Sequence, residues 1–117
     1  MAVVAHVVLR GVSKAQYDEV RAEVGWLERR PDGGLAHLAW WEGDDNHNLD
    51  AWESEAAFAA FGQERLGPAM AKLGIDVVPD VTFHDAHEGF HALSSETDLT
   101  PRPTVASQII RGRVQWE

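Results

Sequence analysis

The stretch GLAHLAWWEGDDNHNLDAWESEAAF, residues 34–58, decides the fold of this chain. Its pattern predicts two strands, 35–42 and 46–53, joined by a tight turn. Ser54 then provides a good helix N-cap, and the acidic residue after it suits the positive end of the helix dipole. We therefore predict a β-hairpin that leads directly into a helix.

The register of this hairpin decides which side chains share a face of the sheet. If Asp44-Asp45 is a two-residue turn, the numbers of residues opposite each other sum to 89. Three pairs then share one face: His37 with Trp52, Ala39 with Asp50, and Trp41 with Asn48. A one-residue change in the loop would move the first strand of the hairpin to the opposite face.

The segment before the hairpin supplies one strand and one helix. Residues 2–10 alternate as a β-branched strand whose odd positions are apolar. Ser13 and Gln16 stand at the two positions of a capping box, so a helix is expected to begin there and to end near Val24 or Leu27.

The segment after the hairpin completes the architecture. The helix that follows Ser54 is expected to kink or restart at Gly67-Pro68 and to end at Gly74. Residues 77–85 form a fourth strand, with Pro79 at its start or on a free edge. The order β-α-β-β-α-β predicts an α+β fold of the ferredoxin-like type, an antiparallel sheet with two helices on one face.

Two helices on one face leave the other face of the sheet uncovered. A face that is half aromatic and half polar suits covering by a second copy of the chain, with a cavity between the two sheets. On this chain we expect that face to carry His6, His37, Trp41, Asn48, Asp50, Trp52, Thr82 and His84.

Length and composition bound the class of protein. The 117 residues are most simply one domain, here residues 1–90, followed by an extension, 91–117. Within the extension, 94–104 is polar and contains proline, whereas 105–116 regains β-like apolar character. The extension is therefore an extra strand, an arm that crosses to a partner subunit, or a disordered tail.

Charge argues against two classes of partner. The net charge of -9 repels phosphate backbones and anionic membranes, and the 10 Lys and Arg form no dense cluster. No apolar run reaches the roughly 20 residues of a membrane helix, and the N-terminus lacks the features of a signal peptide. With no cysteine in the chain, we expect a cytoplasmic protein that binds neither nucleic acid nor membrane.

Three segments resemble a known group of proteins: DAWESEAAF at 50–58, GQERLGPAMAKLG at 62–74 and VTFHDAHEGF at 81–90. They are similar to the dimeric α/β-barrel superfamily, and within it to the antibiotic biosynthesis monooxygenase (ABM) domains. The resemblance covers residues 2–90. It implies a homodimer packed sheet against sheet, and a pocket for a small aromatic or polyketide-like molecule of specialised metabolism.

The resemblance also implies a reaction and a site. Some members are monooxygenases that convert polyketide phenols to quinones without a cofactor. In these members an Asn and a Trp four residues later lie in the pocket, a spacing that Asn48 and Trp52 match. They also carry a pocket tyrosine, whereas the one tyrosine of this chain, Tyr17, falls on the first predicted helix.

Several polar side chains are candidates for chemistry on the shared face. The Asn48 amide suits a phenolate, and the Trp52 indole suits stacking on a planar ring. One of His6, His37 and His84 could act as general base, with Asp50 to orient it. Substrate contacts are expected from Trp41, Arg10 and Thr82, the arginine being either a carboxylate clamp or a partner of Asp50.

Two other functions remain open. A cyclase or isomerase would use one of the three histidines with Asp50 for proton transfer, and a non-catalytic dimer would only bind a ligand. We predict no cofactor and no metal, although haem remains an alternative. His84, His87 and His91 would cluster on a helix but fall at the end of a strand, where their spacing fails.

Overall fold

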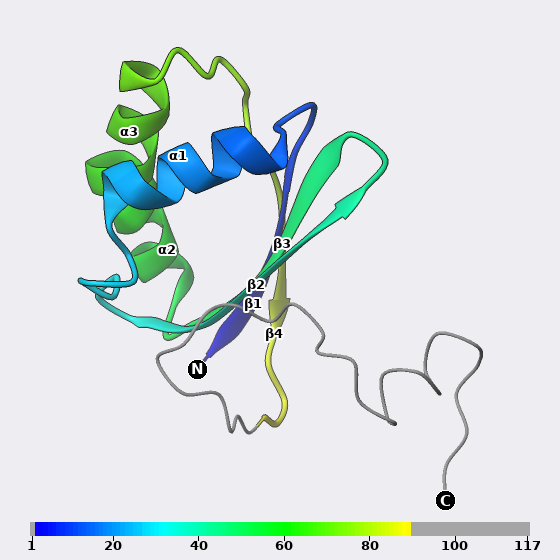
Figure 1. Ribbon diagram of the computed structural model, residues 1–117. Helices are drawn as coiled ribbons and strands as arrows, with labels where there is room; N and C mark the ends of the chain where they lie inside the picture. Colours follow the sequence, from blue (N-terminus) through cyan, green and yellow to red (C-terminus); the bar gives the residue numbers. More distant parts are fainter. Residues whose placement is uncertain (1, 90–117) are drawn as a thin grey trace, which may run out of the picture.

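The computed structural model describes residues 2–89, and Figure 1 shows them as a sheet with its helices packed on one side. The extension 91–117, with its expected strand or arm, lies outside the described residues. The elements follow the predicted order: β1 Val3–Leu9, α1 Lys14–Val24, β2 Gly34–Glu42, β3 Asp45–Trp52, α2 Glu55–Phe61, η1 Gly62–Leu66, α3 Gly67–Lys72 and β4 Asp80–Asp85. The ferredoxin-like α+β prediction is therefore confirmed.

The four strands form one antiparallel sheet in the order β2-β3-β1-β4. The two residues between β2 and β3 are Gly43 and Asp44, and only the glycine has a positive φ, 60°. A positive φ at the first central position is the pattern of a type II′ turn, which suits the twist of a hairpin.

This turn lies one residue earlier than predicted, so the register differs by two. His37 lies opposite Asp50, Ala39 opposite Asn48, and Trp41 opposite Asn46. The predicted sum of 89 is wrong. The three predicted residues of β2 nevertheless share a face with those of β3, because a shift of two preserves the side on which each side chain points.

The first helix begins as its capping box predicts. The Ser13 hydroxyl accepts a hydrogen bond from the Gln16 backbone N–H, and the Gln16 side chain accepts one from the Ser13 N–H. Gly25 ends the helix in the left-handed conformation, with φ 71°. These two caps fix which residues of α1 face the sheet.

The second helical segment is continuous but contains a π turn at the predicted kink. The Gly67 N–H donates to the Gly62 carbonyl, five residues earlier, and Pro68 begins the next α-helical turn. A Cβ on Gly67 would lie 2.8 Å from the Gly62 oxygen, so this close approach requires glycine. The turn therefore accommodates a proline that an unbroken α-helix would reject.

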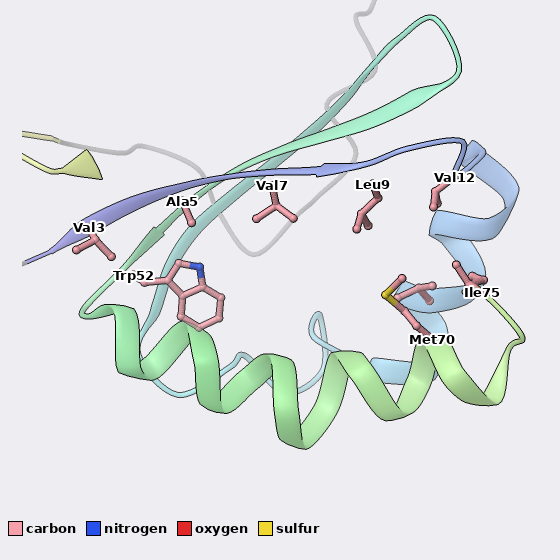
Figure 2. Packing of buried hydrophobic residues seen from close by; sticks show 9 residues of the cluster. Val3, Ala5, Val7, Leu9, Val12, Trp52, Met70 and Ile75 are labelled. Carbon is pink, nitrogen blue, oxygen red and sulfur yellow. The ribbon is translucent and has the colours of Figure 1, made fainter. Parts of the chain in front are cut away.

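The hydrophobic core lies between the sheet and the helices. Its buried members are Val3, Ala5, Val7, Leu9, Val12, Val20, Trp52, Met70 and Ile75. Figure 2 shows the odd-numbered side chains of β1 pointing toward the helical segment that carries Met70. The prediction that the odd face of the first strand packs under the helices is thus confirmed.

The predicted uncovered face is wrong for five of its eight members, which point toward the helices: His37, Trp41, Asn48, Asp50 and Trp52. Val7 pairs with Asn48 and Ala5 with Asp50, so the polar residues of β3 point toward the helices with the apolar side of β1. The face away from the helices, called here the open face, carries His6, Leu38, Trp40, His47, Leu49, Thr82 and His84. Among residues 2–89, no helix is long and apolar enough to cross a membrane.

Candidate active site

A cavity of about 1030 Å³ lies between the sheet and its helices, on the side of β2. Most of its walls are apolar, and its polar wall is made by side chains of β2, β3 and α1. Of the predicted site residues, the structure brings together His37, Trp41, Asn48, Asp50 and Trp52 around it. This cavity lies within one chain, on the helix side of the sheet.

Three of the polar side chains form a hydrogen-bonded chain. The Asp50 carboxylate lies 2.6 Å from Nδ1 of His37, and Nε2 of His37 lies 2.7 Å from the hydroxyl of Tyr17. Since a carboxylate only accepts, Nδ1 carries the proton and Nε2 presents its lone pair to the tyrosine O–H. Asp50, His37 and Tyr17 are called the relay below.

Each member of the relay comes from a different element. Asp50 and His37 are opposite partners on β3 and β2, so the sheet register fixes their distance. Tyr17 lies in the first turn of α1, where its backbone N–H donates to the Ser13 carbonyl at 2.9 Å. The hairpin and the helix cap together assemble the chain of hydrogen bonds.

Both carboxylate oxygens of Asp50 are held. Oδ1 accepts from His37, and Oδ2 accepts from the indole N–H of Trp52 at 3.3 Å. Asp50 is only 9% exposed, and a buried carboxylate requires such partners. The predicted pairing of Asp50 with a histidine is confirmed, and the partner is His37, not His6 or Arg10.

Aromatic rings form the remaining walls. The Tyr17 ring meets Trp26 and Trp41 edge to face, with centroid distances of 5.6 and 5.5 Å. Trp52 packs in the same way against Phe58 at 5.6 Å. Such walls suit a flat aromatic molecule, because stacked and edge-to-face contacts favour planar partners. These rings define the aromatic cavity, the name used below.

Asn48 is buried and already engaged. Its amide nitrogen donates to the Val7 carbonyl at 3.3 Å and to Oδ1 of Asn46 at 2.8 Å. Both amide hydrogens are therefore used within the protein, so Asn48 has no free donor for a substrate oxygen in this conformation. The relay, by contrast, contains groups that can exchange a proton at the cavity wall.

The pKa of Tyr17 is raised to about 12, mainly because the phenol is buried in this cavity; the Arg21 charge lowers it, and the carboxylates of Asp50 and Asp18 raise it. Tyr17 therefore stays protonated at neutral pH and donates its hydrogen bond to His37. The folded pKa lies above the ordinary value of 10.0, so the stability contributed by Tyr17 is present below pH 10 and is lost as the pH rises through about 12.

We expect tyrosinate absorbance to report this shift directly, because Tyr17 is the one tyrosine of the chain. The folded protein should titrate near pH 12 and the urea-unfolded protein near 10. Coincident titration curves for the two forms, measured below the pH of alkaline unfolding, would contradict the burial of this hydroxyl.

The sequence matches no protein-family model and no curated protein. Its fold is shared with solved structures. NE2512, a protein of unknown function from Nitrosomonas europaea, superposes with a TM-score of 0.61 at 15% identity, over 80% of this chain and 96% of the other. A candidate antibiotic biosynthesis monooxygenase from Deinococcus radiodurans gives 0.56 at 17% identity, over 79% and 99%.

SnoaB, a cofactor-independent oxygenase from Streptomyces nogalater, gives a TM-score of 0.54 at 17% identity, over 75% of this chain and 94% of the other. The chain has the fold of the ABM domains. Identities this low establish the shared fold alone. Conclusions about the site of this ABM-like chain therefore come from its own residues.

Four predicted site residues lie away from the aromatic cavity of this ABM-like chain. Arg10 is exposed and pairs with Asp45 at 3.4 Å and with Asp80 at 3.2 Å, which holds the end of β1 to its neighbours. The other three, His6, Thr82 and His84, lie on the open face. Their predicted place beside Asn48 is wrong. Asn48 pairs with Val7, whereas these three lie at even positions of β1 or opposite them, on the other side of the sheet.

The aromatic cavity also contains residues that the sequence did not single out as chemical. Tyr17 and Trp26 both line the cavity. The available signal for Tyr17 was its place on the apolar stripe of the first predicted helix, which had to face the sheet. Within residues 2–89, no group of three or more His, Asp or Glu side chains is arranged to hold a metal ion.

Proposed function

We propose that this protein is a cofactor-independent monooxygenase that acts on an aromatic, phenolic substrate held in the aromatic cavity. The observation that carries the proposal is the relay at the wall of that cavity, with Tyr17 Oη 2.7 Å from His37 and His37 2.6 Å from Asp50. A base at the edge of a cavity with aromatic walls supplies the two needs of such a reaction, a flat binding site and removal of a phenolic proton.

The relay removes the proton in one concerted step. The hydroxyl of Tyr17 accepts the proton of the substrate O–H while its own proton moves to Nε2 of His37. Asp50 stabilises the imidazolium that forms, because its carboxylate already holds Nδ1–H. The high pKa of Tyr17 is compatible with this role, since tyrosine is never required to exist as a free anion.

The substrate anion then supplies the electrons for the reaction. It passes one electron to dioxygen, and the substrate radical and superoxide combine to form a new C–O bond. Loss of water, with cleavage of the O–O bond and of the ring C–H bond, leaves a quinone carbonyl. One oxygen atom enters the product and the other leaves as water, so no external reductant is needed. SnoaB, which shares the fold, is described as an oxygenase of this cofactor-independent type.

A cyclase or isomerase is the second candidate, and a specific observation favours it. The relay contains both a base, His37, and a protonated donor, Tyr17, which together can move a proton between two positions of one substrate. That chemistry needs no dioxygen. The two proposals therefore share the relay and differ in the fate of the substrate anion.

The proposal includes pairing of two copies through the open face. Leu38, Trp40 and Leu49 are 39%, 37% and 39% exposed there, and they are neighbours on adjacent strands. An apolar group of this size on a sheet favours burial against a matching surface. Two identical open faces would cover each other around a two-fold axis.

The experiment offers the purified protein a panel of polycyclic phenols and follows dioxygen uptake and product mass under isotopically labelled dioxygen. We expect one labelled oxygen atom in the product for each dioxygen consumed. Product that forms equally well without dioxygen would favour the cyclase or isomerase. Saturable quenching of tryptophan fluorescence without any product would favour the non-catalytic ligand-binding dimer.

A further inference from the structure

The phenol of Tyr17 lies between an imidazole and two indole rings, an environment that suits electron transfer as well as proton transfer. Its hydroxyl is bonded to an imidazole nitrogen at 2.7 Å, and its ring lies against two indoles at 5.5 and 5.6 Å. We propose that Tyr17 is a redox-active residue, oxidised by one electron to a neutral tyrosyl radical while its phenolic proton moves to Nε2 of His37. This activity is separate from the acid–base role of the relay.

His37 provides an acceptor for the phenolic proton of Tyr17. A phenol that loses an electron becomes a far stronger acid, so its oxidation is easy only where a base receives the proton at the same moment. Nε2 of His37 is such a base, because Nδ1 carries the other proton and bonds to Asp50. The Tyr17 O–H bond breaks, a new N–H bond forms, and the carboxylate of Asp50 stabilises the imidazolium.

The two indoles beside Tyr17 differ as paths for an electron. The Lys14 ammonium lies over the Trp41 ring at 5.7 Å from its centroid. A positive charge at that place disfavours a radical cation on Trp41. No such cation–π contact is found at Trp26 within residues 2–89, and Trp26 is partly exposed. Trp26 therefore links Tyr17 to solvent, where a thiol reductant can return the lost electron.

The oxidant is the aryloxyl radical of a bound phenolic substrate, and this part of the inference rests on the proposed function. If superoxide leaves the cavity without combining with that radical, it takes the proton from Nε2 of His37 and departs as a hydroperoxyl radical. An electron from Tyr17 then reduces the aryloxyl radical to its phenolate, while the Tyr17 proton moves to the vacated Nε2. Tyr17 becomes the radical, and its proton stays on His37. A tyrosine in this position limits damage to the cavity wall by moving the unpaired electron to a residue that can be reduced again.

The test uses the whole protein without substrate, so its outcome is independent of the oxygenase proposal. A flash-generated ruthenium(III) tris(bipyridine) complex serves as the one-electron oxidant, and frozen samples are examined by electron paramagnetic resonance. We expect a tyrosyl signal that narrows when the protein contains ring-deuterated tyrosine. Because the chain has one tyrosine, the signal belongs to Tyr17.

The variants separate the proposal from a merely structural role for Tyr17. Tyr17→Phe should abolish the tyrosyl signal. His37→Gln lacks the base and should slow radical formation by about 10²-fold or more, with loss of the solvent deuterium isotope effect. His84→Gln on the open face is the matched control and should behave like the unaltered protein. Radicals on tryptophan alone, or an equal rate in His37→Gln, would overturn the inference.

Discussion

Replacing His37 with glutamine is expected to lower the turnover of a phenolic substrate by about 10²–10⁴-fold, the usual contribution of a positioned acid–base group. Glutamine can still form hydrogen bonds with Asp50 and Tyr17, so the cavity keeps its shape. It has no basic nitrogen, however, and the proton of Tyr17 then has no acceptor. The loss should therefore fall mainly on kcat, with a small change in the Kd of the ligand.

The measurement is steady-state dioxygen uptake together with the Kd from fluorescence titration. His84→Gln is the control, because it makes the same change of residue type at a position that is exposed on the open face, away from the relay. Equal turnover in His37→Gln and in the unaltered protein would remove the relay from the mechanism, whatever the substrate proves to be.

Replacing Trp52 with alanine is expected to lower the free energy of unfolding by about 3–5 kcal/mol, as for other large aromatic side chains removed from a core. Trp52 is 3% exposed and packs against Phe58 and Phe61 at centroid distances of 5.6 and 5.4 Å. Its loss also leaves Oδ2 of the buried Asp50 without its indole donor. Cavity formation and the unpaired oxygen act in the same direction.

Urea unfolding followed by circular dichroism measures this loss. Trp40→Ala provides a comparison within the same hairpin, because Trp40 is 37% exposed on the open face and leaves no comparable cavity inside a chain. Trp52→Ala should lower the free energy of unfolding clearly more than Trp40→Ala. Similar losses at the two positions would show that Trp52 is not the core residue that its burial indicates.

The order of elements could be predicted from the sequence because each element carries local signals. Ser13 and Gln16 cap one helix, Ser54 caps the next, and the hairpin is marked by its turn residues. The register was wrong by two because Gly43-Asp44 and Asp44-Asp45 are both plausible turns in the sequence. Only the positive φ of Gly43 distinguishes them.

The side of the sheet on which β3 places its residues could not be predicted in the same way. Its pattern puts Asn46, Asn48 and Asp50 on one side and Leu49 on the other, and the ordinary rule would turn the leucine inward. The structure does the opposite, because the inward polar groups bond to one another, to backbone carbonyls and to His37. A strand with reversed polarity is thus the sequence signal of a site beneath it.

The assembly of the relay was equally beyond local reasoning. Asp50 and His37 could be placed on one face from the hairpin, but Tyr17 joins them only because α1 crosses above that face. Where a helix lies over a sheet depends on the packing of Val20 and its neighbours against β1, which no short stretch of sequence specifies.

The relay joins a helix to two strands, so the ultraviolet absorbance of its tyrosine, Tyr17, also reports the tertiary order of the protein. A compact form that kept its secondary structure but lost specific packing would still contain α1 and the hairpin. It would no longer bury the Tyr17 hydroxyl, and the phenol would ionise like that of a free amino acid. One absorbance band can thus distinguish the ordered protein from a molten form that circular dichroism in the far ultraviolet would not separate.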